Sequence, residues 1–253
     1  MDLPPELLDE IISHIPSHDK KSFRNCSLVA KSWIYPSRRR LFEFVDIWED
    51  AHLKSWLGTI PPTNIEVLQH VRSLLCNCQL AERPDSPCGF DYHLRHYSPS
   101  LRQLERLTII LGRLTSPTHI GMPSAFQYTL SYLCLWGCRV TVSTLATIVN
   151  YFPSLTHLDL VSLSHETDDQ PIPPFSRPLR HLTITESLNT GSLNLLDQLM
   201  DQRPQCDEVT VGVLLASSPS LAQRVVDGVD TRIKRLNLAS DLSGVLNVAE
   251  TLW

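Results

Sequence analysis

Three side chains of the types used in nucleophilic catalysis occur in the middle of the sequence: Cys134, His157 and Asp159. An activated thiol needs a base, and the base in turn needs a carboxylate to orient it. The three residues fall in two consecutive apolar segments of the same spacing, which neighbouring strands would hold about 5 Å apart. Acyl transfer also needs an oxyanion site in a cleft that excludes water, and no glycine-bearing turn nearby supplies one. We therefore expect no catalytic residues, and a chain that is not an enzyme.

A second group of side chains has the types that bind zinc: Cys76, Cys78, Cys88, His93 and His96. Together they contain enough ligands for a tetrahedral site. The Cys-x-Cys spacing is tighter than the usual gap, and Cys76 has the spacing of a core residue. We expect core and loop positions here, with no metal and no cofactor.

Composition excludes several further classes of protein. The 253 residues are 42% hydrophobic and 19% charged, which is typical of one or two globular domains. A net charge of -5, with Arg38 to Arg40 as the only basic cluster, offers no binding surface for nucleic acid. The chain has no apolar run of about 18 residues and no secretory signal, so we expect no membrane association. Seven irregularly spaced cysteines then favour reduced thiols, and a cytoplasmic or nuclear location.

The N-terminal segment predicts three short helices that must be held in place by something else. The first, over residues 4–15, has apolar residues at steps of one, three and four, which is too wide a stripe for one packing surface. Asp19 is expected to cap a second helix, and a third is expected over residues 27–34, stopped or bent at Pro36. So small a unit buries too little surface to be stable alone. Two apolar surfaces are therefore predicted.

The stretch LPPELLDEIISHI followed by CSLVAKSW resembles the F-box, whose hallmarks are a Leu-Pro start, an apolar first helix and a Val-x-Lys-x-Trp element. The resemblance covers residues 2–42, although Ala30 stands where many members have cysteine. In that family the unit docks on the adaptor subunit of the SCF (Skp–cullin–F-box) ubiquitin ligase and, through it, on cullin, with apolar anchors filling a groove. The resemblance implies that the adaptor-binding residues are Leu3, Pro4, Leu7, Ile11, Val29 and Trp33. The alternative is that they only form the core of a helical cap, and the role of Lys31 stays open.

From Phe42 onward an L-x-x-L-x-L pattern returns at intervals of about 24 to 33 residues, which is typical of leucine-rich repeats. The units are Phe42/Val45/Ile47, Val71/Leu74/Cys76, Leu104/Leu107/Ile109, Leu130/Leu133/Leu135, Leu155/Leu158/Leu160, Leu179/Leu182/Ile184, Cys206/Val209/Val211 and Ile233/Leu236/Leu238. Helical periodicity over residues 143–152, 193–202 and 220–229 separates the strands. We therefore predict an α/β fold: a three-helix F-box over residues 1–42, then a leucine-rich-repeat solenoid over residues 43–253 with a parallel concave sheet, helices outside and a capping helix over residues 243–253.

Side chains that alternate with the repeat leucines should point away from the core in two rows. One row holds Phe44, Ser73, Arg106, Tyr132, His157, His181, Glu208 and Arg235; the other holds Asp46, Leu75, Thr108, Cys134, Asp159, Thr183, Thr210 and Asn237. Trp48 and Trp136 extend the rows. Aromatic, arginine and histidine side chains suit protein interfaces. We predict a target-binding site at Tyr132, Trp136, His157, Asp159 and His181; alternatively this face is solvated or covered by an inserted loop.

These readings together predict a substrate-recognition adaptor of an SCF-type ubiquitin ligase that binds an unknown target protein through its repeats. The layout resembles the F-box proteins found in large numbers in mushroom-forming fungi. Two alternatives stay open. The chain could be an F-box and repeat scaffold in a complex that ubiquitylates nothing, or a repeat module whose N-terminal helices only cap the solenoid.

Overall fold

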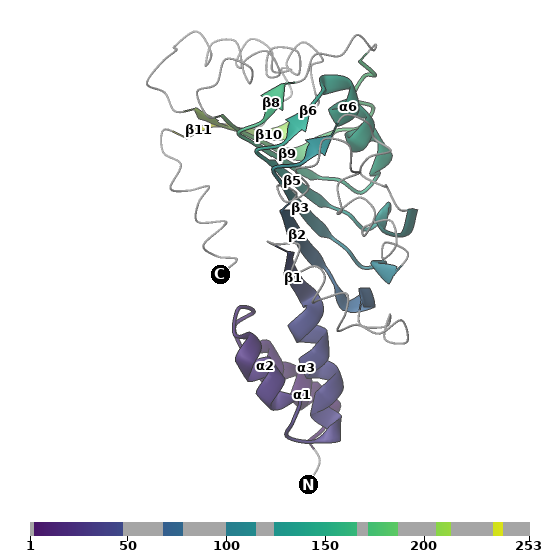
Figure 1. Ribbon diagram of the computed structural model, residues 1–253, viewed down its shortest axis with the longest axis vertical. Helices are drawn as coiled ribbons and strands as arrows, with labels where there is room; N and C mark the ends of the chain where they lie inside the picture. The colour runs from purple at the N-terminus through teal and green to yellow at the C-terminus, as the bar shows by residue number, and fades with distance from the viewer. Residues whose placement is uncertain are drawn as a thin grey trace.

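The structure, a computed structural model, describes residues 3–47, 68–77, 100–114, 124–165, 172–186, 206–213 and 235–239. The described chain is α/β, with helices at the N-terminus followed by a parallel sheet arranged as a solenoid (Figure 1). The predicted helices over residues 193–202, 220–229 and 243–253 lie outside the described residues, as does Trp48. Within the described ranges, no helix has the length and apolar character needed to cross a membrane.

Two of the three N-terminal helices form as the sequence predicts. Helix α1 spans Pro5–Ser13 and begins on a proline. Proline is tolerated there because the N–H groups of a first helical turn have no partner within the helix. Helix α2 spans Lys20–Cys26, and the carboxylate of Asp19 caps it by accepting hydrogen bonds from the Ser22 N–H at 3.0 Å and the Ser22 hydroxyl at 2.6 Å. Both helices pack against α3.

The prediction of a third helix over residues 27–34 that stops or bends at Pro36 was wrong. Residues 27–29 form a turn, Ala30 is extended, and α3 spans Lys31–Glu43 with Pro36 inside it. A proline there removes one N–H donor from the second turn. Pro36 is nevertheless buried, in a helix that packs against both α1 and α2.

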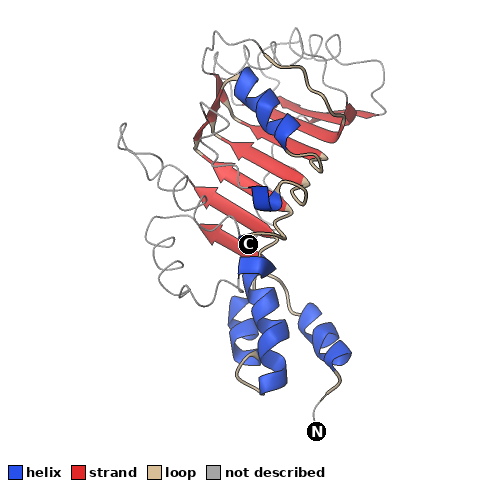
Figure 2. Cartoon of the chain, turned by 90° about the vertical axis from the view of Figure 1, so that its right-hand side faces the viewer, coloured by secondary structure: helices blue, strands red, loops and turns tan. Residues whose placement is uncertain are grey.

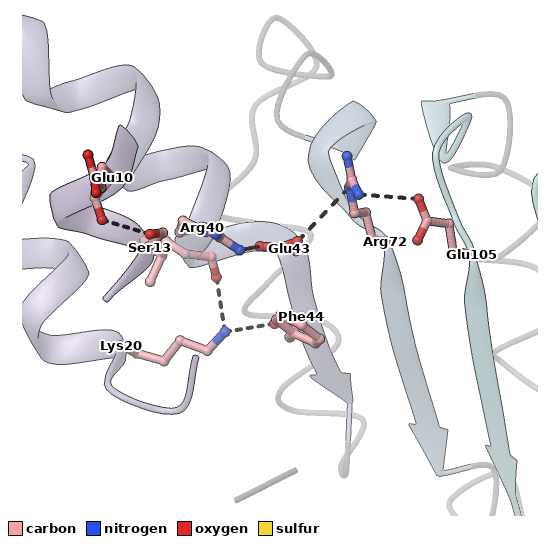
Figure 3. Close-up of polar contacts among 9 residues, drawn as sticks. Glu10, Ser13, Lys20, Arg40, Glu43, Phe44, Arg72 and Glu105 are labelled. Carbon is pink, nitrogen blue, oxygen red and sulfur yellow. Dashed lines mark hydrogen bonds and ion pairs between the residues drawn. The ribbon is translucent and has the colours of Figure 1, made fainter. Parts of the chain in front are cut away.

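Helix α3 continues into the sheet without a linker. It ends at Glu43, and strand β1 (Phe44–Ile47) begins at the next residue. Phe42, expected as the first repeat position, therefore lies in the helix and is only half-buried, because α3 extends past Pro36. The ammonium group of Lys20 donates hydrogen bonds to the backbone carbonyls of Leu41 at 3.2 Å and Phe44 at 2.9 Å, which ties α2 to this junction (Figure 3).

The described strands form a main sheet of eight parallel strands (Figures 1 and 2). In spatial order they are β1, β2 (Ser73–Asn77), β3 (Arg106–Ile110), β5 (Tyr132–Trp136), β7 (His157–Val161), β9 (Leu179–Glu186), β10 (Cys206–Val213) and β11 (Arg235–Ala239). Neighbours in the sheet are neighbours along the chain, as a solenoid requires, because each turn packs on the next.

The core lies on one side of this sheet. The repeat positions Val71, Leu74, Cys76, Leu104, Leu107, Ile109, Leu130, Leu133, Leu135, Leu155, Leu158, Leu160, Leu179, Leu182 and Ile184 are all buried. Helix α6 (Val142–Tyr151) covers part of that side and adds Leu145, Ile148 and Val149 to the same cluster. Cys138 is also buried there, and its thiol donates to the backbone carbonyl of Ile109 at 3.3 Å.

A second set of strands, absent from our expectations, lies beyond the ends of three main strands. The two-residue strands β4 (Arg113–Leu114), β6 (Arg139–Val140) and β8 (Ser164–His165) pair in parallel. Before each, one residue turns the chain with a positive φ: Leu111 (56°), Gly137 (62°) and Ser162 (50°). Their N–H groups donate to carbonyls of the following main strand, at 2.7, 2.8 and 2.6 Å respectively.

Candidate functional site

The N-terminal helices carry an exposed apolar patch. Leu7 and Ile11 of α1 are 45% and 42% exposed, whereas Leu8 and Ile12 are 2% and 1% exposed. Residues four apart lie on one side of a helix and consecutive residues are about 100° apart around it, so the two pairs define two different sides of α1. The inner pair packs within the helices, and the prediction of two apolar surfaces is confirmed.

Further apolar side chains are exposed before α1 and in the turn before α3. Five exposed apolar side chains, which we call the helical patch, are Leu3, Leu7, Ile11, Leu28 and Val29. Leu28 and Val29 are 83% and 66% exposed. Of the other predicted adaptor-binding residues, Pro4 is exposed, and Trp33, in the first turn of α3, is half-buried. Leu28 was not among the predicted residues, although its place beside Val29 in the sequence could have indicated it. Grouped apolar side chains on a surface are typical of a site for a protein partner.

The second candidate surface is the side of the main sheet that faces away from the core, which we call the outward face. Strand pairing aligns Arg106 with Tyr132, Tyr132 with His157, His157 with His181, and His181 with Glu208. The second predicted row is aligned in the same way, from Asp46 in β1 to Asn237 in β11. The predicted register is therefore confirmed along the whole sheet.

Side chains of the first row stack into a ladder across five strands. The guanidinium carbon of Arg106 lies 4.3 Å from the centre of the Tyr132 ring, a favourable cation–π contact. Tyr132 and His157 have ring centres 6.4 Å apart, and His157 and His181 stack at 4.3 Å with an angle of 16° between their planes. The ladder ends where Nδ1 of His181 lies 3.3 Å from a carboxylate oxygen of Glu208.

A hydrogen bond links the two rows. The Tyr132 hydroxyl donates to the carboxylate of Asp159 at 2.5 Å. Because Cys134 lies opposite Asp159 in the pairing, Tyr132 and Asp159 are diagonal neighbours, which a tyrosine is long enough to bridge. Burial raises the pKa of the Tyr132 hydroxyl, and the charge of Asp159 raises it further, so the phenol stays protonated and remains a donor. The predicted register was enough to indicate this contact, but our reading of the sequence missed it.

The same geometry bears on the Cys134, His157 and Asp159 combination. Burial and the neighbouring Asp159 raise the pKa of the Cys134 thiol, which opposes the thiolate that a nucleophile requires. The Asp159 carboxylate accepts its hydrogen bond from Tyr132, and Nδ1 of His157 lies 2.8 Å from the hydroxyl of Thr156. The three side chains are thus neighbours without the hydrogen bonds of an activated cysteine.

The predicted target-binding residues are brought together only in part. Tyr132, His157, Asp159 and His181 form connected contacts, whereas Trp136 lies four residues further along β5, about 13 Å away along an extended strand. Trp136 is half-buried, and its carbonyl accepts from Leu111 at the turn that follows β3. It belongs to the far end of the outward face.

For metal binding, the described ranges contain no group of three or more histidine, cysteine or acidic side chains with suitable positions. Cys76 is fully buried in β2, while Cys78, Cys88, His93 and His96 lie outside the described residues. Cys138 is held as a protonated thiol, since burial raises its pKa to about 12.

No protein-family model matches the chain. No curated protein matches it either.

Proposed function

We propose that the chain is a substrate-recognition adaptor of an SCF-type ubiquitin ligase, in which the N-terminal helices dock on the adaptor subunit and the repeats bind a target protein. The observation that carries the proposal is the helical patch, because it lies on the segment that resembles the F-box and is exposed in the isolated chain. Four of the six residues implied by that resemblance are exposed large apolar or proline side chains of α1 or the residues before it. Such a role would place the protein in the cytoplasm or nucleus.

Burial of this patch by a partner would supply part of the binding free energy. Burying the exposed part of each side chain would contribute about 1 kcal/mol, since full burial of a leucine or isoleucine contributes roughly 1.5–3 kcal/mol. The five side chains together then supply a few kcal/mol before the cost of association. An adaptor groove made of helices fits the observed geometry, because Leu7 and Ile11 are spaced as anchors of a helix that lies in a groove.

The outward face has the features expected of the target-binding end. It presents Arg106, Tyr132, His157 and His181, the types of side chain found at protein interfaces. Under this proposal the protein brings the target close to the ubiquitin-carrying enzyme and performs no chemistry itself. The repeats are read as leucine-rich repeats because L-x-x-L-x-L supplies their buried positions.

Capture of the adaptor subunit and cullin by the purified full chain tests the docking step. The wild-type protein should retrieve both, and Leu7→Asp combined with Val29→Asp should lose both, because a carboxylate would have to be buried at each position. The matched control is Tyr128→Asp, which replaces an exposed aromatic residue of the repeat half, 72% exposed, and should leave capture unchanged. If the wild type retrieves no adaptor subunit, or the double variant retrieves as much as the wild type, the proposal fails.

Reconstituted ubiquitylation distinguishes the non-ubiquitylating alternative. A captured complex that binds a target from the native cell and transfers ubiquitin to it is the expected result. A complex that contains adaptor and cullin, binds the target and leaves it unmodified would favour a scaffold. Absence of cullin in every capture, with the repeats folded, would favour helices that only cap the solenoid.

A further inference from the structure

One side of α3 presents two arginines and an aromatic ring to solvent. Tyr35 is 63% exposed, and Arg38 and Arg39 are exposed as well. Residues three and four positions apart lie on one side of a helix, so both arginines are neighbours of Tyr35. Pro36 and Ser37, which come between them in the sequence, are buried. The three exposed side chains therefore lie on the side of α3 that is turned away from its packed side.

His70, in the turn before β2, extends this surface beyond the helix. Its ring meets the ring of Tyr35 edge-on, with ring centres 5.4 Å apart and an angle of 84° between the two planes. Burial lowers the pKa of His70 and the charge of Arg39 lowers it further, so the imidazole is neutral at neutral pH. The positive charge of this surface comes from the arginines. We call Tyr35, Arg38, Arg39 and His70 the basic face.

The third arginine of the run is already paired with a carboxylate. Arg40 donates to the carboxylate of Glu43 at 2.8 Å. Glu43 also lies 4.0 Å from Arg72, which in turn lies 3.3 Å from Glu105 (Figure 3). Glu43 is the only acidic residue of α3, and two arginines already share it. The helix therefore has no second carboxylate for the basic face.

Carboxylates on the other described N-terminal helices are also separate from the basic face. Asp19 is engaged as the cap of α2. Within the described part of the chain, the guanidinium groups of Arg38 and Arg39 form no ion pair and no hydrogen bond. Each of them can donate up to five hydrogen bonds. The remaining acidic residues of these helices all belong to α1: Glu6, Asp9 and Glu10.

We propose that the basic face binds an acidic segment of a partner protein, whose carboxylates pair with Arg38 and Arg39 while the segment packs on Tyr35. A guanidinium group matches a carboxylate with two parallel hydrogen bonds, which gives the pair its geometry as well as its energy. Tyrosine and arginine are also the residue types that contribute most at protein interfaces. The basic face shares no residue with the helical patch or the outward face, so this inference adds a surface and does not rest on the proposed function.

Other anionic partners fit this face less well than a protein segment does. Lys31, which is exposed one turn before Tyr35, adds a third cation on the same side of the helix. Nucleic acid gains affinity with each phosphate that is neutralised, and three cations neutralise few. Anionic membranes are recognised by clusters of about four to eight basic residues. A short acidic segment needs only two or three carboxylates to use every cation present.

Fluorescence anisotropy of labelled peptides with the full chain tests the proposal. In the probe glutamate alternates with serine, and in its counterpart glutamine replaces glutamate. The glutamate peptide should bind at low ionic strength and the glutamine peptide should bind more weakly; the net charge of -5 on the chain opposes this order unless a local basic site exists. Arg38→Gln with Arg39→Gln should weaken binding of the glutamate peptide by about threefold for each charge removed. Tyr35→Ser changes no charge and should also weaken binding by about threefold.

The control, Lys21→Gln with Arg24→Gln, removes the same charge from exposed sites on α2. These two lysine and arginine side chains lie three residues apart on one side of α2, a different side from that of the buried Phe23. The control should therefore leave binding of the glutamate peptide unchanged.

Binding of the glutamate peptide no tighter than that of the glutamine peptide, or equal losses in the two double variants, would overturn the proposal. An unchanged affinity of Tyr35→Ser would overturn it as well, because it would leave only a diffuse attraction between charges. Tighter binding of a thymidine oligonucleotide or of phosphatidylserine vesicles than of the glutamate peptide, lost in Arg38→Gln with Arg39→Gln, would reject a protein partner for this face.

Discussion

The same substitution at two adjacent leucines of α1 should destabilise the protein to very different extents. Leu8→Ala removes a side chain that is 2% exposed, and a buried leucine replaced by alanine costs about 2–5 kcal/mol of folding free energy. Leu7→Ala removes one that is 45% exposed, so its cost should stay below about 1.5 kcal/mol. Helix propensity does not confuse the comparison, because both changes replace leucine by alanine within one helix. We expect Leu8→Ala to be the more destabilising by roughly 2 kcal/mol.

Hydrogen exchange of the backbone amides in α1, α2 and α3 measures this difference where it arises, without requiring the whole chain to unfold in one step. Leu8→Ala should accelerate exchange throughout the three helices, because its side chain lies in their shared interior. Leu7→Ala should leave exchange close to that of the wild type and reduce adaptor affinity instead. Equal acceleration by both variants would refute the reasoning, because it would mean that the outer side of α1 is already packed in the free chain.

Two further substitutions test the elements that hold the solenoid together. Gly137→Ala should lower the free energy of unfolding by about 1–2 kcal/mol, because alanine disfavours the φ of 62° at this position and its Cβ would lie 2.6 Å from Cδ2 of Leu111. Chemical denaturation measures the loss, and an unchanged midpoint would contradict the predicted strain. Lys20→Met should destabilise the junction between α3 and β1 by about 1–3 kcal/mol, because the carbonyls of Leu41 and Phe44 lose a charged donor. Hydrogen exchange at the end of α3 measures this loss, and Lys21→Met, at an exposed lysine, is the control. Equal effects of the two substitutions would contradict the role of Lys20 at the junction.

The strand register could be predicted from the sequence because the spacing of buried residues determines it. Leu133 and Leu135 must point into the core, so Tyr132 and Cys134 must point away, and a shift of one residue would expose both leucines. The same reasoning holds for Leu158 and each following repeat. Where one periodic pattern repeats along a chain, it aligns the strands as well as identifying them.

Local turns and diagonal contacts escaped prediction because no such periodicity describes them. The short strands β4 and β8 follow turns at Leu111 and Ser162, two residue types that seldom adopt positive φ and so carry no turn signal. The start of α3 depended on the extended backbone of Ala30 rather than on a capping side chain. Pro36 was interpreted as a helix end, because an interior proline costs a hydrogen bond, but it lies inside α3 and is buried there.

The junction between helices and sheet determines how the two proposed surfaces can work together. A flexible linker would let the helical patch and the outward face adopt many relative orientations. Here Glu43 ends a helix and Phe44 starts a strand, and Lys20 holds the carbonyls on either side of that step. The backbone carbonyl of Glu43 also accepts from the N–H of Arg72, just before β2, at 3.0 Å. A target on the outward face would consequently be held in a defined position relative to whatever binds the helical patch, which is the geometry that transfer by proximity requires.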